Sequence, residues 1–152
     1  MIYFALLAST ASGLLAGALV TEACVLVPYW KTMDPEQFRR LHSTLSPLLF
    51  RFYAPLTVAG TSLPLLVCAS QWAVGGPAVW LWTVSATCAT GLLAFYFGFF
   101  RQANIEFANG HSQETSLEQT GETLSTWATM HQMRTIVAVL GFVFAGLALA
   151  VA

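Results

Sequence analysis

Four long apolar stretches dominate the sequence, and short polar or glycine-rich segments separate them. They cover about residues 2–29, 36–73, 78–104 and 124–152. A helix rises about 1.5 Å per residue, so about 20 apolar residues cross the hydrocarbon core of a bilayer. The pattern therefore predicts an all-α fold, an integral membrane bundle of four transmembrane helices forming one domain over residues 1–152.

Turn signals support these boundaries. Asp34-Pro35 fits a helix N-cap followed by proline at the first helical position, which predicts that the second helix starts there. Gly75-Gly76-Pro77 is typical of the turn that closes this helix. Prolines inside a helix remove backbone hydrogen bonds and predict kinks. The second helix contains three of them, Pro47, Pro55 and Pro64.

Residues 109–126 form the long hydrophilic stretch before the fourth helix. It opens with the turn signal Asn109-Gly110, and His111 next to it is expected to be solvated. The acidic residues Glu114, Glu118 and Glu122 then recur every four residues without a lysine partner. A solvated loop or the start of a helix explains this pattern better than a cation site does.

Composition places the chain in the membrane class. Hydrophobic residues make up 57% of it and charged residues 9%, against about 25% charged residues in a typical soluble domain. The net charge of −1 gives no basic patch, so nucleic acid is not an expected partner. The partner expected instead is the lipid bilayer.

All charged side chains lie in or beside the two polar connections, so one face of the bundle carries them. The positive-inside rule assigns Lys31, Arg39 and Arg40 to the cytoplasm and both ends of the chain to the outside, in a bacterial inner membrane. Aromatic belts are expected at both interfaces. Trp72, Trp80 and Trp82 are assigned to the outer belt, and Tyr29 and Trp30 to the inner one.

Four ionisable residues are expected to share one depth near the inner hydrocarbon boundary. Glu22, Arg51, Arg101 and Arg134 each follow about twenty apolar-rich residues, counted from the outer ends of the helices. Glu22 could form a simple ion pair with one of the arginines or serve a function. The arginines could extend to lipid headgroups or hold an anionic or phenolic substrate. Arg51 points away from His42 on an unkinked helix, which favours the headgroup.

Trp127, His131 and Arg134 stand at i, i+4 and i+7, so they share one helix face within about 60°. His131 and His42 could ligate haem together, or one could act as a general base, or each could simply pack. His42 would lie about 9 Å further out than His131 on straight helices, which argues against two-histidine ligation. The sequence contains no HxxxH, ExxH or cysteine-based pattern, so no metal site is predicted.

Several of these residues also form a recognisable pattern. Asn104, followed by Trp127-x-x-Met130-His131-x-x-Arg134-Thr135 at the start of the last apolar helix, resembles the anthrone-oxygenase-like family of small four-span membrane proteins. The first half is similar as well, with Pro28 after a Gly/Ala-rich span and then His42, Pro47 and Pro55. Gln102-Ala-Asn104-Ile-Glu106 keeps one asparagine of the Asn-x-Pro-x-Asn pattern common in the family.

The resemblance implies oxidation of an electron-rich phenolic substrate by molecular oxygen, as in anthrone to anthraquinone, without a classical cofactor. It assigns the base to His131, stabilisation of the anion to Arg134 and Asn104, and a stacking wall to Trp127. Substrate-binding positions are then expected at Glu22, His42, Arg101 and Arg51. The substrate would be a lipophilic aromatic or quinone-like molecule in a polar pocket at the cytoplasmic membrane boundary.

Two alternatives stay open from the sequence. The chain could be a non-catalytic subunit of a larger membrane complex or a homo-oligomer, because Ser9, Gly13, Gly17 and Thr21 form a small-residue stripe suited to helix packing. It could also be a b-type haem protein.

Overall fold

The structure is a computed structural model that describes residues 2–108 and 116–151. The elements are α1 (Ile2–Thr21), η1 (Glu22–Leu26), α2 (Val27–Trp30), α3 (Pro35–Val74), α4 (Val79–Phe95), η2 (Tyr96–Phe100), α5 (Arg101–Ala108) and α6 (Leu117–Ala150). The interpretations of Asn109-Gly110, His111 and Glu114 lie outside the described residues.

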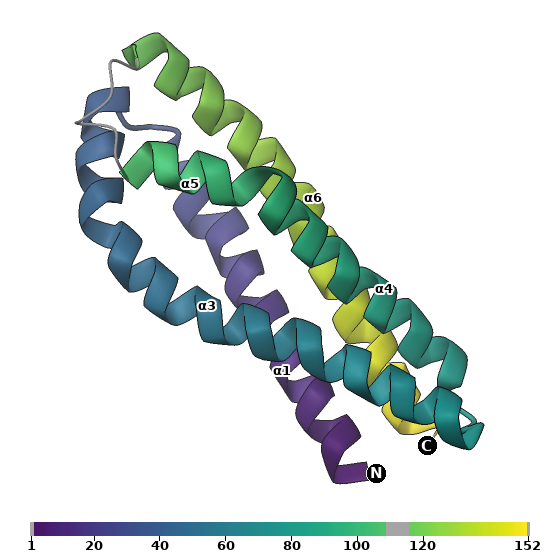
Figure 1. Cartoon of the computed structure of the whole chain (residues 1–152). Coiled ribbons are helices and arrows are strands. Elements are labelled where there is room, and N and C mark those ends of the chain that lie inside the picture. The colour runs from purple at the N-terminus through teal and green to yellow at the C-terminus, as the bar shows by residue number, and fades with distance from the viewer. Residues whose placement is uncertain (1, 109–115, 152) are drawn as a thin grey trace.

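These elements join into four long rods, each long and apolar enough to cross a membrane: Ile2–Trp30, Pro35–Val74, Val79–Ala108 and Leu117–Ala150. The rods run side by side, and both ends of the chain lie at the same end of the bundle (Figure 1). The predicted all-α fold with four membrane-spanning helices is therefore confirmed.

Side-chain caps define where two of the helices begin. Asp34 accepts a hydrogen bond from the backbone N–H of Glu36 at 2.9 Å, as the N-cap signal predicts. Ser116 caps α6 by accepting from the N–H of Gln119 at 3.1 Å. Helix α6 therefore begins at Leu117, before the predicted start near residue 124, and Glu118 and Glu122 belong to its first turns.

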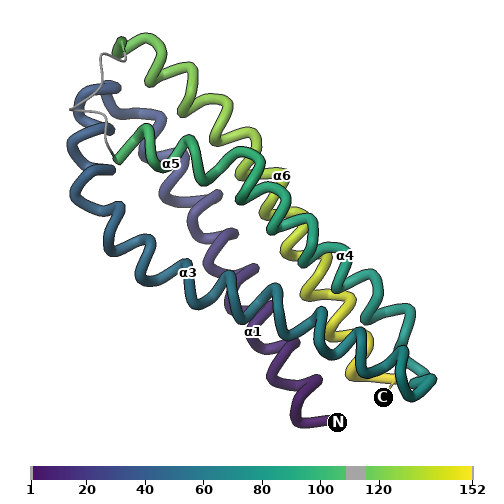
Figure 2. The backbone as a smooth tube through the Cα atoms, viewed as in Figure 1, coloured from purple at the N-terminus to yellow at the C-terminus, as the bar shows by residue number. Residues whose placement is uncertain are grey.

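Helix α3 continues through its three prolines and bends along its length (Figure 2). Pro64 has no N–H to offer the carbonyl of Gly60, four residues earlier. The hydroxyl of Ser12 lies 3.5 Å from that carbonyl, but its shorter hydrogen bond, 2.9 Å, goes to the carbonyl of Ala8. The bend carries the first half of α3 away from the helices that its second half contacts.

Small side chains form the core at the end of the bundle that holds both chain ends. Its buried residues are Ala5, Ala8, Val67, Ala78, Trp82, Ala145 and Ala148. One prediction fails here. Trp82 is fully buried and packs in this core, whereas Trp72 and Trp80 are exposed as expected for a belt. Gly17 and Thr21 of the small-residue stripe on α1 are exposed in this chain, so packing of that stripe against another chain stays a prediction.

Large side chains form the core at the opposite end. Its buried residues are Val27, Trp30, Phe38, Phe100, Ala103, Phe107, Leu124, Trp127 and Ala128. The assignment of Trp30 to an inner belt is wrong, because its indole packs edge-on against Phe38 and Trp127 inside this core. This aromatic core lies beside the candidate site.

Candidate active site

A pocket of about 750 Å³ lies between α3 on one side and α4, η2 and α5 on the other. It extends along α3 from His42 to Ser62, and Glu22, Trp127 and Arg134 contribute to its lining from η1 and α6. Most of its lining is apolar, with a few polar groups. This volume and this composition are typical of sites that bind small organic molecules.

Two short π-helical segments border the pocket. The segment η1 begins at Glu22, and η2 begins at Tyr96; both of these residues line the pocket. A π-helical turn inserts an extra residue into a helix, changes the direction of the side chains that follow, and is frequent at functional sites. No feature of the sequence signalled either segment.

Glu22 and His131 form a buried pair next to the pocket. Glu22 is 5% exposed, and its Oε2 lies 3.7 Å from Nε2 of His131. The same ring nitrogen lies 3.3 Å from the carbonyl oxygen of Leu19, and the imidazole is 0% exposed. Glu22 lines the pocket, whereas His131 does not. The carboxylate therefore faces the pocket, and the imidazole contacts it on the side away from the pocket.

Arg134 and Tyr53 surround the same carboxylate. Both line the pocket, and both side chains lie close enough to Glu22 to interact with it. The guanidinium carbon of Arg134 is also 4.7 Å from the ring centroid of Phe100, a cation–π arrangement. The Tyr53 hydroxyl donates to the carbonyl of Ala18 at 3.2 Å. Tyr53 was not predicted from the sequence, because an aromatic residue in an apolar helix carries no signal of what it faces.

Asn104 and Trp127 hold each other at the pocket wall. The indole N–H of Trp127 donates to Oδ1 of Asn104 at 3.0 Å. The indole also stacks on the His131 imidazole, with ring centroids 4.9 Å apart and planes at 5°. The helix spacing predicted that Trp127 and His131 share a face, and the stacked geometry confirms it. Asn104, which lies on α5, joins Trp127 and His131 of α6 through this hydrogen bond.

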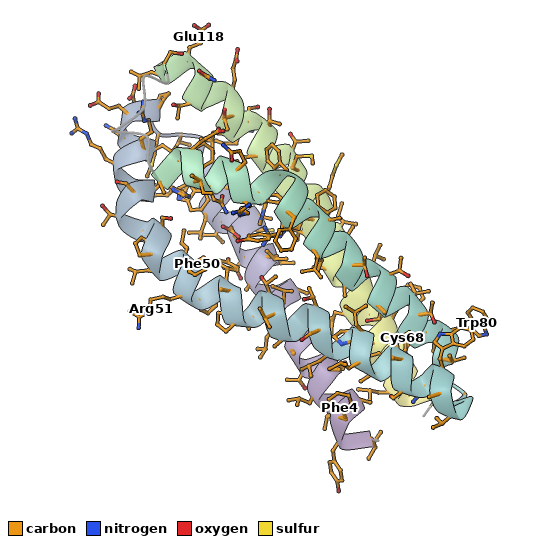
Figure 3. All side chains as sticks on the ribbon, in the orientation of Figure 1. Phe4, Phe50, Arg51, Cys68, Trp80 and Glu118 are labelled. Carbon is orange, nitrogen blue, oxygen red and sulfur yellow. The ribbon has the colours of Figure 1, made fainter. Side chains whose placement is uncertain are left out.

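The remaining predicted positions lie apart from this group. His42 lines the pocket further along α3, among aromatic rings, and Arg101 lines it as an exposed side chain. Arg51 is exposed and is absent from the pocket lining. Figure 3 shows its side chain pointing away from the bundle. The structure thus brings seven of the eight predicted residues to or directly behind one pocket and leaves Arg51 outside.

The two helical histidines are connected through two indole rings. His42 contacts Trp30 at 6.3 Å between centroids, Trp30 contacts Trp127 at 5.8 Å, and Trp127 stacks on His131. This arrangement gives no support to a haem held by both histidines. Within residues 2–108 and 116–151, no group of three His, Cys, Asp or Glu side chains could hold a metal ion.

The four apolar helices and the pocket between them define an integral membrane protein with a candidate small-molecule site. Residues 48–144, more than half of the chain, match the family model of anthrone oxygenases, so the chain belongs to the anthrone oxygenase family. Family membership makes it an oxygenase-type membrane protein. Comparisons with curated proteins and with solved structures gave no match. Asn104, Trp127, His131 and Arg134 lie inside the matched range, and Glu22 and His42 lie before it.

Proposed function

We propose that this protein oxidises a lipophilic phenolic aromatic of the anthrone type with molecular oxygen inside the pocket between α3 and α4. One observation carries the proposal: a buried carboxylate, Glu22, and a guanidinium, Arg134, line the same largely apolar pocket. An acid–cation pair in an apolar site suits a reaction that removes a proton and creates an anion on an aromatic substrate.

The reaction begins with removal of a proton from the CH₂ group opposite the ring carbonyl of the substrate. The resulting enolate is electron-rich, and molecular oxygen oxidises it by forming a C–O bond at that carbon, which gives a peroxide. The new C–O bond becomes a carbonyl when the O–O bond breaks and the second C–H proton leaves. One oxygen atom stays in the quinone, and the other leaves as water with the two hydrogens.

Glu22 is the proposed base, because its carboxylate lines the pocket. His131 is a positioning residue in this scheme, since its imidazole lies 3.7 Å behind the carboxylate and is covered by Trp127. This proposal moves the base from His131, to which the family resemblance assigned it, onto its neighbour.

Arg134 is the proposed partner of the enolate oxygen. Its guanidinium lines the pocket and interacts with Glu22, so a substrate seated between them has its acidic carbon near one group and its carbonyl near the other. A fixed cation in a water-poor site stabilises developing negative charge more strongly than water does. Asn104 orients Trp127 at the pocket wall.

The substrate is proposed to enter from the bilayer. Phe50, Val58 and Phe97 line the pocket and are 64%, 65% and 67% exposed, so its rim is apolar and faces outward between two membrane helices. A lipophilic molecule dissolved in lipid meets this rim without crossing water. Lys31, Arg39 and Arg40 favour placing the His42 end of the pocket at the cytoplasmic side of a bacterial inner membrane, with both chain ends outside.

The test is the Glu22→Gln variant, which keeps the shape of the side chain and removes its basicity. Protein in lipid nanodiscs is given anthrone, and anthraquinone formation and oxygen consumption are measured against a protein-free sample. Turnover is expected to fall about 10²- to 10⁴-fold, the usual contribution of a general base.

Glu118→Gln is the matched control, because Glu118 is exposed at the start of α6, at one end of the bundle (Figure 3), and is not part of the pocket lining. It should keep wild-type turnover. Full turnover in Glu22→Gln, together with loss of turnover in His131→Gln, would return the role of base to His131. Absence of any wild-type turnover above background would refute the oxidation itself for this probe.

A further inference from the structure

We propose that His42 is a specificity-determining residue, which hydrogen-bonds a hydroxyl group on the outer ring of the substrate. This inference rests on the proposed function only for the aromatic nature of the substrate. It deepens that function by assigning a second recognition point, remote from Glu22 and Arg134.

His42 is a buried polar side chain without a polar partner. It is 6% exposed and lines the pocket, and its Nδ1 is buried without a hydrogen-bond partner in the described part of the chain. Nδ1 of His131 is likewise buried without a partner, but its Nε2 lies near the carbonyl of Leu19 and the carboxylate of Glu22. The two histidines therefore differ at Nε2, since no described residue hydrogen-bonds Nε2 of His42. An unpaired polar group in a buried position is costly, so a partner for the imidazole is expected.

Aromatic rings surround the imidazole of His42. The ring centroids of Phe107, Phe38 and Trp30 lie 5.3, 5.5 and 6.3 Å from its own. Phenyl rings offer the imidazole nitrogens no conventional hydrogen bond, and Trp30 contacts the imidazole through its ring, edge-on. His42 nevertheless lines the pocket, and because Nδ1 is covered, Nε2 is the ring nitrogen available to a molecule bound there.

The position of His42 determines the shape of that molecule. Tyr53, which lies beside Glu22, follows His42 by three turns of α3, about 16 Å along the helix axis. The side chains of both ends line the same pocket and shorten this separation. A fused-ring molecule with its reacting carbon near Glu22 would therefore meet His42 through a polar substituent on its outer ring. A hydroxyl fits either tautomer of the imidazole, because it can donate to the bare nitrogen or accept from the N–H.

The experiment compares anthrone with 2-hydroxyanthrone, which carries one hydroxyl on an outer ring. Binding is followed by quenching of tryptophan fluorescence, since Trp127 lines the pocket, and turnover is measured in parallel. Wild-type protein is expected to bind the hydroxylated probe about tenfold more tightly, the equivalent of one net hydrogen bond. His42→Phe should abolish this preference, and His42→Gln, which can still donate and accept, should keep part of it.

Thr44→Ala is the control, because Thr44 is exposed on the same helix and outside the pocket lining. A wild-type preference that persists in His42→Phe overturns the proposal, and so does the lack of any preference in the wild type. If His42→Phe does not fold, as judged by its helical circular dichroism, His42→Gln and His42→Leu decide instead. Selective binding without oxidation of either probe refutes the proposed function and leaves the role of His42 standing. Oxidation of both probes with equal binding supports the proposed function and refutes the role of His42.

Discussion

The two ends of the bundle use the same four rods but side chains of very different size. Near the chain ends the core consists mainly of alanines, and further along the bundle the cavity bounded by Ser12, Gly60 and Ser85 measures about 10 Å³. Toward the polar end the core consists of tryptophans and phenylalanines, and a pocket of about 750 Å³ lies next to it. Small side chains let helices approach closely, whereas bulky ones hold them apart.

The pocket exists because of how α3 is placed. The second half of α3 packs closely, with Gly60 against Leu15, and its first half bends away. The aromatic core and the pocket both lie on this side of the bundle, next to α5. The alanine-rich core and the candidate site thus lie at opposite ends of the bundle, so substitutions can address them separately.

After the loss expected for Glu22→Gln, the largest effect is expected at Arg134, a half-buried cation that lines the pocket. Arg134→Gln removes the charge proposed to stabilise the enolate, so turnover of anthrone should fall about 10²- to 10³-fold. The measurement is anthraquinone formation by protein in nanodiscs. Arg51→Gln is the matched control, because Arg51 is exposed and points away from the bundle. Equal losses in the two variants would mean that both arginines act through the lipid headgroups.

A smaller effect is expected at Gly60 in the closely packed end. A Cβ added at Gly60 would lie 2.9 Å from Cδ2 of Leu15 and 3.2 Å from the carbonyl oxygen of Ala11. Gly60→Ala should therefore lower the free energy of unfolding by about 1–3 kcal/mol through overpacking. Thermal unfolding followed by circular dichroism in detergent measures the change.

Gly17→Ala provides the contrast, because nothing lies within 4 Å of a Cβ at that position. The unfolding temperature should stay the same or rise slightly, since alanine favours a helix more than glycine does. If Gly17→Ala were the more destabilising variant, α1 would pack through its small-residue stripe, for example against a second copy of the chain.

The smallest expected effect concerns the bond between Asn104 and Trp127. Asn104→Ala leaves the indole N–H without its acceptor, which should cost about 0.5–1.5 kcal/mol and release the indole at the pocket wall. The near-ultraviolet circular dichroism of the tryptophans should weaken. Gln102→Ala is the control, because Gln102 bonds Glu106 on the exposed side of the same helix. An unchanged spectrum in Asn104→Ala would mean that packing alone holds Trp127.

The sequence by itself determined the four membrane helices, the cap at Asp34 and the shared face of Trp127 and His131. These features depend on composition and on the 3.6-residue period of a single helix, and both are local properties. The family resemblance carried by Asn104, Trp127, His131 and Arg134 also follows from the sequence, and the family match confirms it.

Only the tertiary structure decided which faces meet. Trp82 had the right depth for the outer belt, yet it is buried in the core. Arg51 points outward, which agrees with its facing on α3 but not with the substrate-binding position that the family resemblance implied. Tyr53 and the cage around His42 became visible only when α3 was placed against its neighbours. The reason is physical: periodicity fixes angles around one helix axis. Proline bends and π-helical turns then rotate later residues by amounts that depend on packing against other helices.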